Sequence, residues 1–218
     1  MKKKNLLRNI KTLLLSFLIL QLIGCEKDDE VRIIFNHNLV YETLTDIEGN
    51  VYKTIEIGTQ TWMAENLRVT KMNDASSSIP CSWVFNDPLA FKNTYGALYN
   101  WNTVNTGKIC PQGWHVPNDD EWAILTNYLG GDSIAGGKLK ETGTKHWLNP
   151  NLGATNESGF TALPIELWFD LGEMGFLWSS SEFNNDYAWY RALDQNSAAV
   201  YRNFTSKNME YSVRCLKD

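Results

Sequence analysis

The sequence predicts an α+β fold, with short helices in the middle of the chain and strands near its end. A well-capped helix starts after Asn118, and four short segments rich in aromatic and β-branched residues follow between residues 176 and 215. Turn-forming residues separate these segments at the spacing typical of an antiparallel meander. Because the strands follow the helices instead of alternating with them, a parallel α/β architecture is not expected.

Residues 1–24 predict a lipoprotein signal peptide. A basic start precedes an apolar segment from Thr12 to Ile23, which is short for a membrane span. The following Gly24-Cys25 resembles a lipobox, at which the cysteine sulfur is acylated before cleavage. An ordinary signal peptide with a cysteine nearby, or a membrane helix, is the alternative. We therefore expect lipidation of Cys25 and a membrane as partner through the lipid anchor.

The chain after Cys25 is acidic, and residues 25–44 are predicted to form a tether. Five residues directly after the cysteine form a charged run: Glu26, Lys27, Asp28, Asp29 and Glu30. A charged run near a terminus is typical of a solvated linker. This run also resembles the acidic sorting signal of Bacteroidetes lipoproteins, which implies a location on the outer membrane, facing the cell exterior.

Charge and composition limit the partners of the mature chain. Removal of residues 1–24 takes away five positive charges, so the formal net charge changes from −5 to −10. Such an acidic chain is not expected to bind nucleic acid. What remains is long enough for one domain, predicted over residues 45–218. All nine tryptophans lie after residue 24, and this content suits a loop-rich fold in which large rings fill gaps.

A hairpin is predicted at the start of the domain. Residues 51–57 alternate and are rich in β-branched side chains, Gly58 permits a turn, and residues 61–68 form the second arm. Residues 71–87 are polar and predict a loop. Apolar residues at positions 97, 98, 101 and 104 then favour a short helix within residues 95–104.

The central helix has the clearest start and end. Asn118 is a favourable N-cap, and Glu121 three residues later completes a capping box. One apolar face follows at helical spacing: Trp122, Leu125 and Leu129. Two glycines after Leu129 end the helix. A weaker third helix is predicted over residues 133–142.

The C-terminal part predicts five short strands. Residues 158–164 form the first, which a proline ends. The other four cover residues 176–180, 187–193, 198–203 and 211–215. No internal repeat and no domain break interrupts this part of the chain.

Three cysteines remain after Cys25, and an exported protein can form disulfides. One pair with one unpaired thiol is the simplest arrangement. We predict a disulfide between Cys110 and Cys215, because both lie beside strongly patterned core segments. The bond would close a loop of about 100 residues and contribute about 4 kcal/mol. Cys81 lies in a polar stretch and is left as the free thiol.

Metal binding and catalysis are not predicted. The three histidines, His37, His115 and His146, are too scattered for a zinc site. Residues 118–121 carry the oxygen ligands that calcium prefers, but the helix cap already explains them. Cys110 with His115 resembles a nucleophile and base only superficially, since the disulfide accounts for the cysteine. We expect no metal, no cofactor and no enzyme activity.

Ligand binding is the more natural role for the C-terminal strands. Four residues on these strands are candidates: Trp178, Trp189, Arg191 and Arg202. Exposed aromatic rings on a sheet can stack on sugars, and arginines can pair with carboxylates. The alternative is that the rings belong to the core. Separately, Asp132-Ser133-Ile134 resembles a short O-glycosylation sequence of Bacteroidetes, which makes Ser133 a candidate modification site.

Six short motifs occur in a characteristic order along the chain. They are TWMAENL from Thr61, YGALYNW from Tyr95, CPQGWHVP from Cys110, SGFTALP from Ser158, WSSSE from Trp178 and SVRC from Ser212. Together they resemble the Fibrobacter succinogenes major paralogous domain over residues 45–218. Residues 165–168 depart from the family, which usually has glycines and an arginine there, and Glu210 replaces a usual glycine.

The resemblance implies a C-type-lectin-like layout, with short helices packed on a twisted antiparallel sheet and long irregular loops. This layout is also similar to that of the formylglycine-generating enzymes. The implied function is that of a surface-anchored lipoprotein that binds a glycan or an extracellular protein without catalysis. A structural component of the envelope without a small ligand, or a degenerate oxidase of the formylglycine-generating type, are the alternatives.

Overall fold

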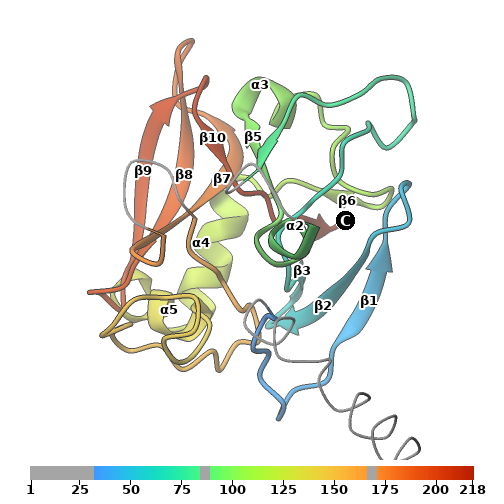
Figure 1. Cartoon of the computed structure of the whole chain (residues 1–218). Helices are drawn as coiled ribbons and strands as arrows, with labels where there is room; N and C mark the ends of the chain where they lie inside the picture. Colours follow the sequence, from blue (N-terminus) through green and yellow to red (C-terminus); the bar gives the residue numbers. More distant parts are fainter. Residues whose placement is uncertain (1–31, 84–88, 166–170) are drawn as a thin grey trace, which may run out of the picture. The chain divides into compact units, whose positions relative to one another are not determined.

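The computed structural model describes residues 32–83, 89–165 and 171–218, and Ile33–Asp218 form one compact unit (Figure 1). The predicted signal peptide, the lipidation site Cys25 and the charged run at residues 26–30 lie outside the described residues. Within the described ranges, no helix has the length and apolar character needed to cross a membrane.

The compact unit begins earlier than the boundary at residue 45 that the sequence predicts. Leu39 and Tyr41 pack on the core, and the backbone N–H of Ile34 donates a hydrogen bond to Glu141 Oε1 (2.5 Å). Residues 33–44, which the sequence assigns to the tether, are therefore part of the folded domain. The apolar side chains in this stretch anchor it to the domain.

A five-stranded antiparallel sheet within the described residues joins both ends of the domain. Its order is β1-β2-β3-β11-β6, with β1 (Glu42–Thr45), β2 (Val51–Ile57), β3 (Gln60–Met63), β11 (Leu216–Lys217) and β6 (Trp114–His115). Strands β2 and β3 confirm the predicted hairpin, although its second arm is shorter than predicted. Leu216 pairs with Trp62 on one side and His115 on the other. The last strand of the chain, β11, therefore joins β3 to β6 in this sheet.

Strand β5 and helix α3 share the segment that the sequence predicts as one helix. Strand β5 (Ala97–Asn100) lies between β4 (Ser82–Trp83) and β10 (Glu210–Tyr211). Helix α3 (Trp101–Val104) starts only after Asn100, whose Oδ1 accepts a hydrogen bond from the Thr103 N–H (2.9 Å). The prediction of one short helix within residues 95–104 is therefore wrong for residues 97–100 and right for residues 101–104. Neighbouring strands on both sides pair with residues 97–100, and helix α2 (Leu89–Tyr95) precedes them.

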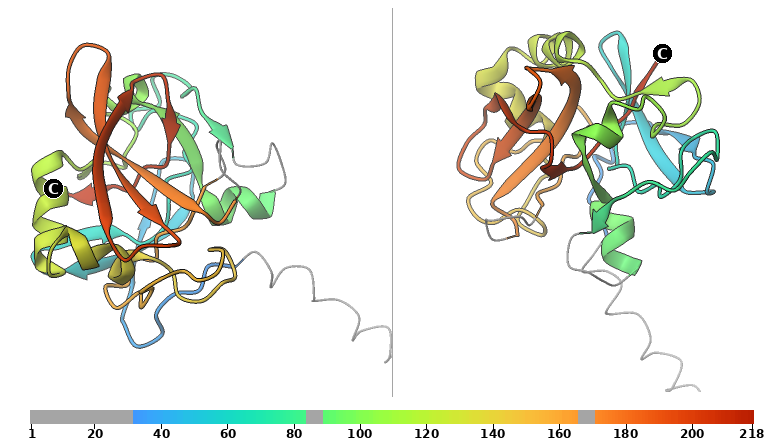
Figure 2. Two further views of the ribbon diagram at one scale, coloured as in Figure 1. Left: turned by 90° about the vertical axis from the view of Figure 1, so that its left-hand side faces the viewer. Right: turned by 90° about the horizontal axis from the view of Figure 1, so that it is seen from above.

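Helices α4 (Asp119–Tyr128) and α5 (Asp132–Leu139) lie along one face of the C-terminal sheet (Figure 2). The capping box of α4 is confirmed, because Asn118 Oδ1 accepts from the Glu121 N–H (2.9 Å) and Glu121 Oε2 accepts from the Asn118 N–H (2.8 Å). Trp122 and Leu125 of α4 are fully buried. Helix α5 confirms the predicted third helix.

The predicted meander is confirmed for three of its four strands. Strands β7 (Met174–Glu182), β8 (Tyr187–Asp194) and β9 (Val200–Ser206) form an antiparallel sheet in the order β7-β8-β9. Of the fourth predicted strand, residues 211–215, only Tyr211 lies in a strand, at the end of β10. Residues 212–215 are buried in the core, and β11 begins after them. Residues 158–164 are not a strand either, since Thr161 has a φ of 55° and Ala162 forms an isolated bridge with Lys140.

Aromatic rings fill both clusters of the core. In one cluster, Trp62, Trp122 and Phe160 pack with ring centroids 4.8 to 5.9 Å apart. In the other, Trp178 packs on Tyr211 with the centroids 4.7 Å apart. Such ring pairs add packing energy to that of area burial. This is the packing that the tryptophan content predicts.

Arg214 holds the irregular segment at residues 158–164 in place. Its guanidinium is fully buried, which lowers its pKa to about 9. Nε donates to Asn66 Oδ1 (2.8 Å), Nη2 donates to the carbonyl of Thr161 (2.8 Å), and Nη1 donates to the carbonyl of Phe160. The charge is therefore stabilised by oriented acceptors from two distant parts of the chain.

The predicted disulfide between Cys110 and Cys215 is confirmed, and both cysteines are buried. Cys81 is a free cysteine of intermediate exposure. Burial, together with the negative charges of Glu210 and Glu48, raises the pKa of the Cys81 thiol. A raised pKa lowers the thiolate fraction at neutral pH, so Cys81 has no sign of an activated nucleophile.

Lys140 connects two loops from the interior of the domain. Its Nζ donates to the carbonyls of Leu152 (3.1 Å), Asp194 (2.8 Å) and Ser197 (2.8 Å). Burial lowers the pKa of Lys140 to about 8. The three carbonyls satisfy all three donors of the ammonium group, which ties the loop before Phe160 to the turn between β8 and β9.

Candidate functional site

The C-terminal sheet has one face that is covered by helices at one end and free at the other (Figure 2). Side chains alternate between the two faces along each strand. From the covered end toward the free end, the cross-strand pairs on this face are Leu193–Val200, Arg191–Arg202 and Trp189–Phe204. The first pair is buried in the core. The pair Arg191–Arg202 contacts the start of α4. The pair Trp189–Phe204 therefore lies beyond the end of this helix.

At the middle pair, two arginines share one carboxylate of α4. Arg191 Nη1 donates to Asp119 Oδ1 (2.7 Å), and Arg202 Nε donates to Asp119 Oδ2 (2.8 Å). Burial acts to raise the pKa of Asp119, but hydrogen bonds from Arg202 and Arg191 outweigh this effect and lower the pKa. Arg191 is 2% exposed, whereas the side chain of Arg202 is 43% exposed. Arg202 is thus the arginine that a ligand can reach.

Four aromatic side chains gather at the free end of this face, and we call them the aromatic platform: Phe183, Tyr187, Trp189 and Phe204. Phe183 stacks on Phe204 with the ring centroids 4.0 Å apart, and Trp189 meets both edge-on at 5.0 and 5.7 Å. Tyr187 meets Phe204 at 5.9 Å. Phe183, Tyr187 and Phe204 are 41–42% exposed. The platform is therefore a connected aromatic surface and not a set of isolated rings.

The four residues that the sequence predicts to bind ligand are divided by the structure. Trp189 and Arg202 lie at the platform, with Arg202 Cζ 3.4 Å from the centroid of the Trp189 ring. Trp178 is a core residue, because it is fully buried and its Nε1 donates to the carbonyl of Tyr99 (2.6 Å). Its prediction as a ligand-binding residue is corrected accordingly. Arg191 is buried against Asp119 and supports the surface without reaching it.

Sequence reasoning misses Phe183, Tyr187 and Phe204. Phe183 lies just past the end of β7, and the register between β8 and β9 decides that Phe204 stands opposite Trp189. The alternation of side chains along a strand is the signal that could have identified Tyr187 and Phe204. Tyr187 shares a face with Trp189 on one strand, and Phe204 shares a face with Arg202 on the next.

Two of the three histidines, His115 and His146, are held by carboxylates. His115 lies between Asp218 Oδ1 (2.6 Å) and Glu121 Oε1 (2.9 Å). Partial burial lowers the pKa of His115, but these two carboxylates outweigh it, so the pKa lies above its ordinary value. His146 is buried with its Nδ1 2.6 Å from Glu141 Oε2. Across the described ranges, no three His, Cys, Asp or Glu side chains gather closely enough to hold a metal ion.

Ser133, the predicted glycosylation site, is exposed on α5. This helix packs near the start of β9, where Gly136 lies against the backbone of Ala199. Ser133 therefore belongs to the helix-covered end of the sheet. A glycan at this position would leave the platform uncovered.

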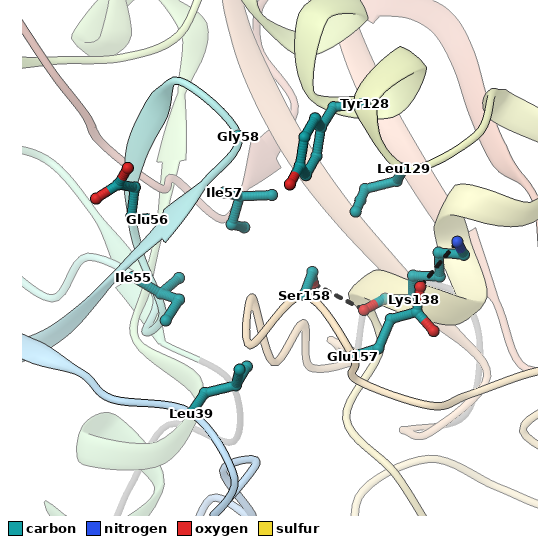
Figure 3. Close-up of a pocket in the computed structure, with 10 residues that line it drawn as sticks. All are labelled: Leu39, Ile55, Glu56, Ile57, Gly58, Tyr128, Leu129, Lys138, Glu157 and Ser158. Atoms are coloured by element: carbon teal, nitrogen blue, oxygen red, sulfur yellow. Dashed lines mark hydrogen bonds and ion pairs between the residues drawn. The ribbon is translucent and has the colours of Figure 1, made fainter.

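A pocket of about 550 Å³ lies between β2, α4 and the loop before Phe160 (Figure 3). Aliphatic side chains form much of its wall: Leu39, Ile55, Ile57 and Leu129. Across from β2, Lys138 Nζ pairs with Glu157 (2.8 Å), and Ser158 Oγ donates to the carbonyl of Lys138 (2.7 Å). The pocket has the size of a small-molecule site. Two of its charged groups, Lys138 and Glu157, already pair with each other, and the connected rings of the platform offer the more specific chemistry.

These features define an α+β domain of curled antiparallel sheets and short helices, stabilised by a disulfide and carrying an exposed aromatic surface. A family model described as the Fibrobacter succinogenes major domain matches residues 55–217, and the chain belongs to this family. The resemblance drawn from the six motifs is thereby confirmed. No curated protein and no solved structure matches the chain significantly.

Proposed function

We propose that this chain is a lipoprotein of the outer membrane, anchored through Cys25 and facing the cell exterior, that binds a saccharide through the aromatic platform. A lectin-like role and layout belong to this proposal. Catalysis does not, because Cys110 is held in the disulfide and Asp119, the carboxylate beside Arg202, is paired with two arginines.

The observation that carries the proposal is the mutual contact of four rings, three of which are about two-fifths exposed. A connected apolar surface on a soluble domain commonly marks a binding site. The C–H faces of a sugar pack on aromatic faces, while its polar groups need donors such as those of Arg202.

A saccharide fits the platform better than a protein partner does. A stable protein interface buries roughly 800 Å² on each side. Four rings, each already packed against another, expose much less than this. A short stretch of sugar units matches a surface of this size. A protein ligand is the alternative, and it would be favoured if no saccharide bound on a glycan array.

Removal of two platform rings is expected to abolish most saccharide binding. The double variant Trp189→Ala/Phe204→Ala removes the centre of the platform, and loss of central aromatic contacts costs about 2 kcal/mol or more, which is roughly a thirtyfold loss of affinity. The measurement is binding of the purified full-length protein to a glycan array. Tyr201→Ala is the matched control. Tyr201 is 46% exposed on β9, but it lies three positions before Phe204 and its side chain is therefore on the opposite face of the sheet. Equal losses in both variants would contradict the proposal.

Protease added to intact cells is expected to remove the domain. An outward-facing lipid anchor leaves residues 33–218 accessible, whereas an inward-facing one protects them until the outer membrane is broken. The Cys25→Ala variant, which cannot be acylated on sulfur, should no longer remain with the membrane fraction. Protection of the wild-type protein on intact cells would show that the assigned location is wrong.

A further inference from the structure

We propose that Arg202 is a preformed receptor for an oxyanion, so that the saccharide bound by the platform is an acidic one. The inference rests on the proposed function of the platform and specifies its ligand. The oxyanion is the carboxylate of a uronic acid or the sulfate ester of a sulfated sugar, since a guanidinium fork accepts either group.

Arg202 keeps donors that its pairing with Asp119 does not use. A guanidinium carries five N–H donors. Arg202 approaches Asp119 side-on, with Nε 3.1 Å from Oδ1 and 2.8 Å from Oδ2, and Nη2 forms an ion pair with Oδ2 at 2.8 Å. Both hydrogens of Nη1 and the outward hydrogen of Nη2 remain, and no residue in the described ranges accepts from Nη1. One hydrogen of Nη1 and this hydrogen of Nη2 form the end-on edge of the fork, which matches two coplanar oxygens.

This edge of Arg202 is also held in a fixed orientation. Arg202 Cζ lies 3.4 Å from the centroid of the Trp189 ring, so the guanidinium is stacked on the indole. Asp119 fixes its rotation in the plane of the stack. Binding to a side chain that is already ordered costs less conformational entropy than binding to a free one. The exposed fraction of the Arg202 side chain, 43%, leaves room for a ligand at the free edge.

The charges around Arg202 also favour an anionic ligand. Arg191 is buried and donates to the Asp119 carboxylate (2.7 Å) and to the Asp119 carbonyl (3.2 Å). Because a buried arginine cannot lose its counter-ion without a large penalty, Asp119 is neutralised by Arg191 even when Arg202 engages a ligand. The three groups together carry one surplus positive charge.

Other charged groups near the free end of the sheet do not remove this surplus by contact with Arg202. Glu182, at the end of β7, pairs with Lys207 (2.6 Å). Asp186 is exposed in the turn before β8, where solvent and salt screen its charge. A positive position on a chain whose mature net charge is −10 is a local feature and favours an anionic ligand. The aromatic rings beside it supply the stacking surface for the sugar that carries the anion.

The test compares the affinity of purified full-length protein for polygalacturonate and for the same polymer after reduction of its carboxyl groups. Dextran sulfate and unmodified dextran form the second pair and separate sulfate from carboxylate recognition. We expect the wild-type protein to bind one charged polymer at least about tenfold more tightly than its neutral counterpart, because a charge-assisted hydrogen-bond pair contributes at least this factor. The preference should weaken as the salt concentration rises.

Variants at Arg202 separate the contribution of the guanidinium geometry from that of the positive charge. Arg202→Gln should lose the preference for the charged polymer, and Arg202→Lys should recover only part of it, because lysine keeps the charge but not the fork. Lys138→Gln removes one positive charge at the pocket and should leave the preference unchanged. Thermal unfolding of each variant checks that the domain is folded.

Three results overturn the inference in different ways. If the wild-type protein binds charged and neutral polymers equally and the Trp189→Ala/Phe204→Ala variant binds neither, the platform binds saccharides but Arg202 is no oxyanion receptor. If the wild-type protein binds none of the four polymers and no glycan on an array, the proposed function fails as well. An unchanged preference in Arg202→Gln also overturns the inference.

Discussion

Replacement of Arg214 by methionine is expected to lower the free energy of unfolding by about 3–5 kcal/mol, which is the usual effect of breaking a buried charged network. Methionine fills much of the volume but donates nothing. The carbonyls of Phe160 and Thr161 and the side chain of Asn66 would remain buried without the donors they now accept from. Urea denaturation of the wild type and the variant measures the difference.

The matched control is Arg202→Met, which removes an arginine of large surface exposure. Its effect should stay within about 1 kcal/mol, the range of exposed ion pairs. Arg214→Lys should recover only a minor part of the stability, since an ammonium group cannot reach three acceptors with the geometry of the guanidinium fork. A loss below about 1 kcal/mol in Arg214→Met would mean that the segment at residues 158–164 is held by its ring packing alone.

Loss of the disulfide is expected to cost about 4 kcal/mol. Cys110 and Cys215 are 105 positions apart, so the bond removes a large loop-closure entropy from the unfolded chain. The double variant Cys110→Ala/Cys215→Ala should unfold at a lower urea concentration than the wild type. Both side chains are buried, and the removed sulfur atoms add a packing loss to the entropic one.

A reducing agent provides the internal check on this prediction. It should destabilise the wild type to nearly the level of the double variant and leave the variant itself unchanged. Cys81→Ala, which removes the free cysteine, should keep the full response to reduction. A double variant with wild-type stability in the absence of reductant would show that the covalent link does not limit the unfolded chain.

Local patterns in the sequence predict the elements that depend on local interactions. The capping box of Asn118 and Glu121 is a contact between residues three positions apart, and it fixes the start of α4. The alternation in residues 51–57 and 187–193 likewise predicts strands correctly. In these cases the residues that decide the structure lie within the segment itself.

Distant contacts decide the elements that the sequence does not predict. Residues 97–100 become a strand because β4 and β10 flank them, and β10 comes from a part of the chain more than a hundred positions later. Residues 158–164 leave the extended conformation because Arg214 binds their carbonyls. Propensity and spacing contain no information about such partners, so tertiary context overrides them.

The same limit applies to the candidate site. Trp178 and Trp189 look equivalent in the sequence, yet Trp178 faces the core cluster of Tyr211 and Trp189 faces the free end of the sheet. The burial of Arg191 and the exposure of Arg202 follow from the position of Asp119 at the start of α4. The packing of the helix on the sheet distinguishes the two arginines, together with the place of Arg191 on the central strand β8 and of Arg202 on the edge strand β9.

The family motifs and the platform occupy different parts of the domain. The motifs supply core residues such as Trp62, Phe160, Trp178 and Arg214, together with the disulfide cysteines. All four platform residues lie in the chain between the fifth motif, which ends at residue 182, and the sixth, which begins at residue 212. The motifs therefore define the fold, and the segment between them is where ligand specificity would reside.

An NMR titration of the isotope-labelled protein with oligogalacturonate tests whether the aromatic platform is the ligand-binding surface. We expect shifts of the Trp189 indole N–H and of backbone amides around Trp189 and Phe204, with Gly58 and Ser158 at the pocket unchanged. Shifts confined to Gly58 and Ser158, with the Trp189 indole unaffected, would show that the platform is not the ligand-binding surface.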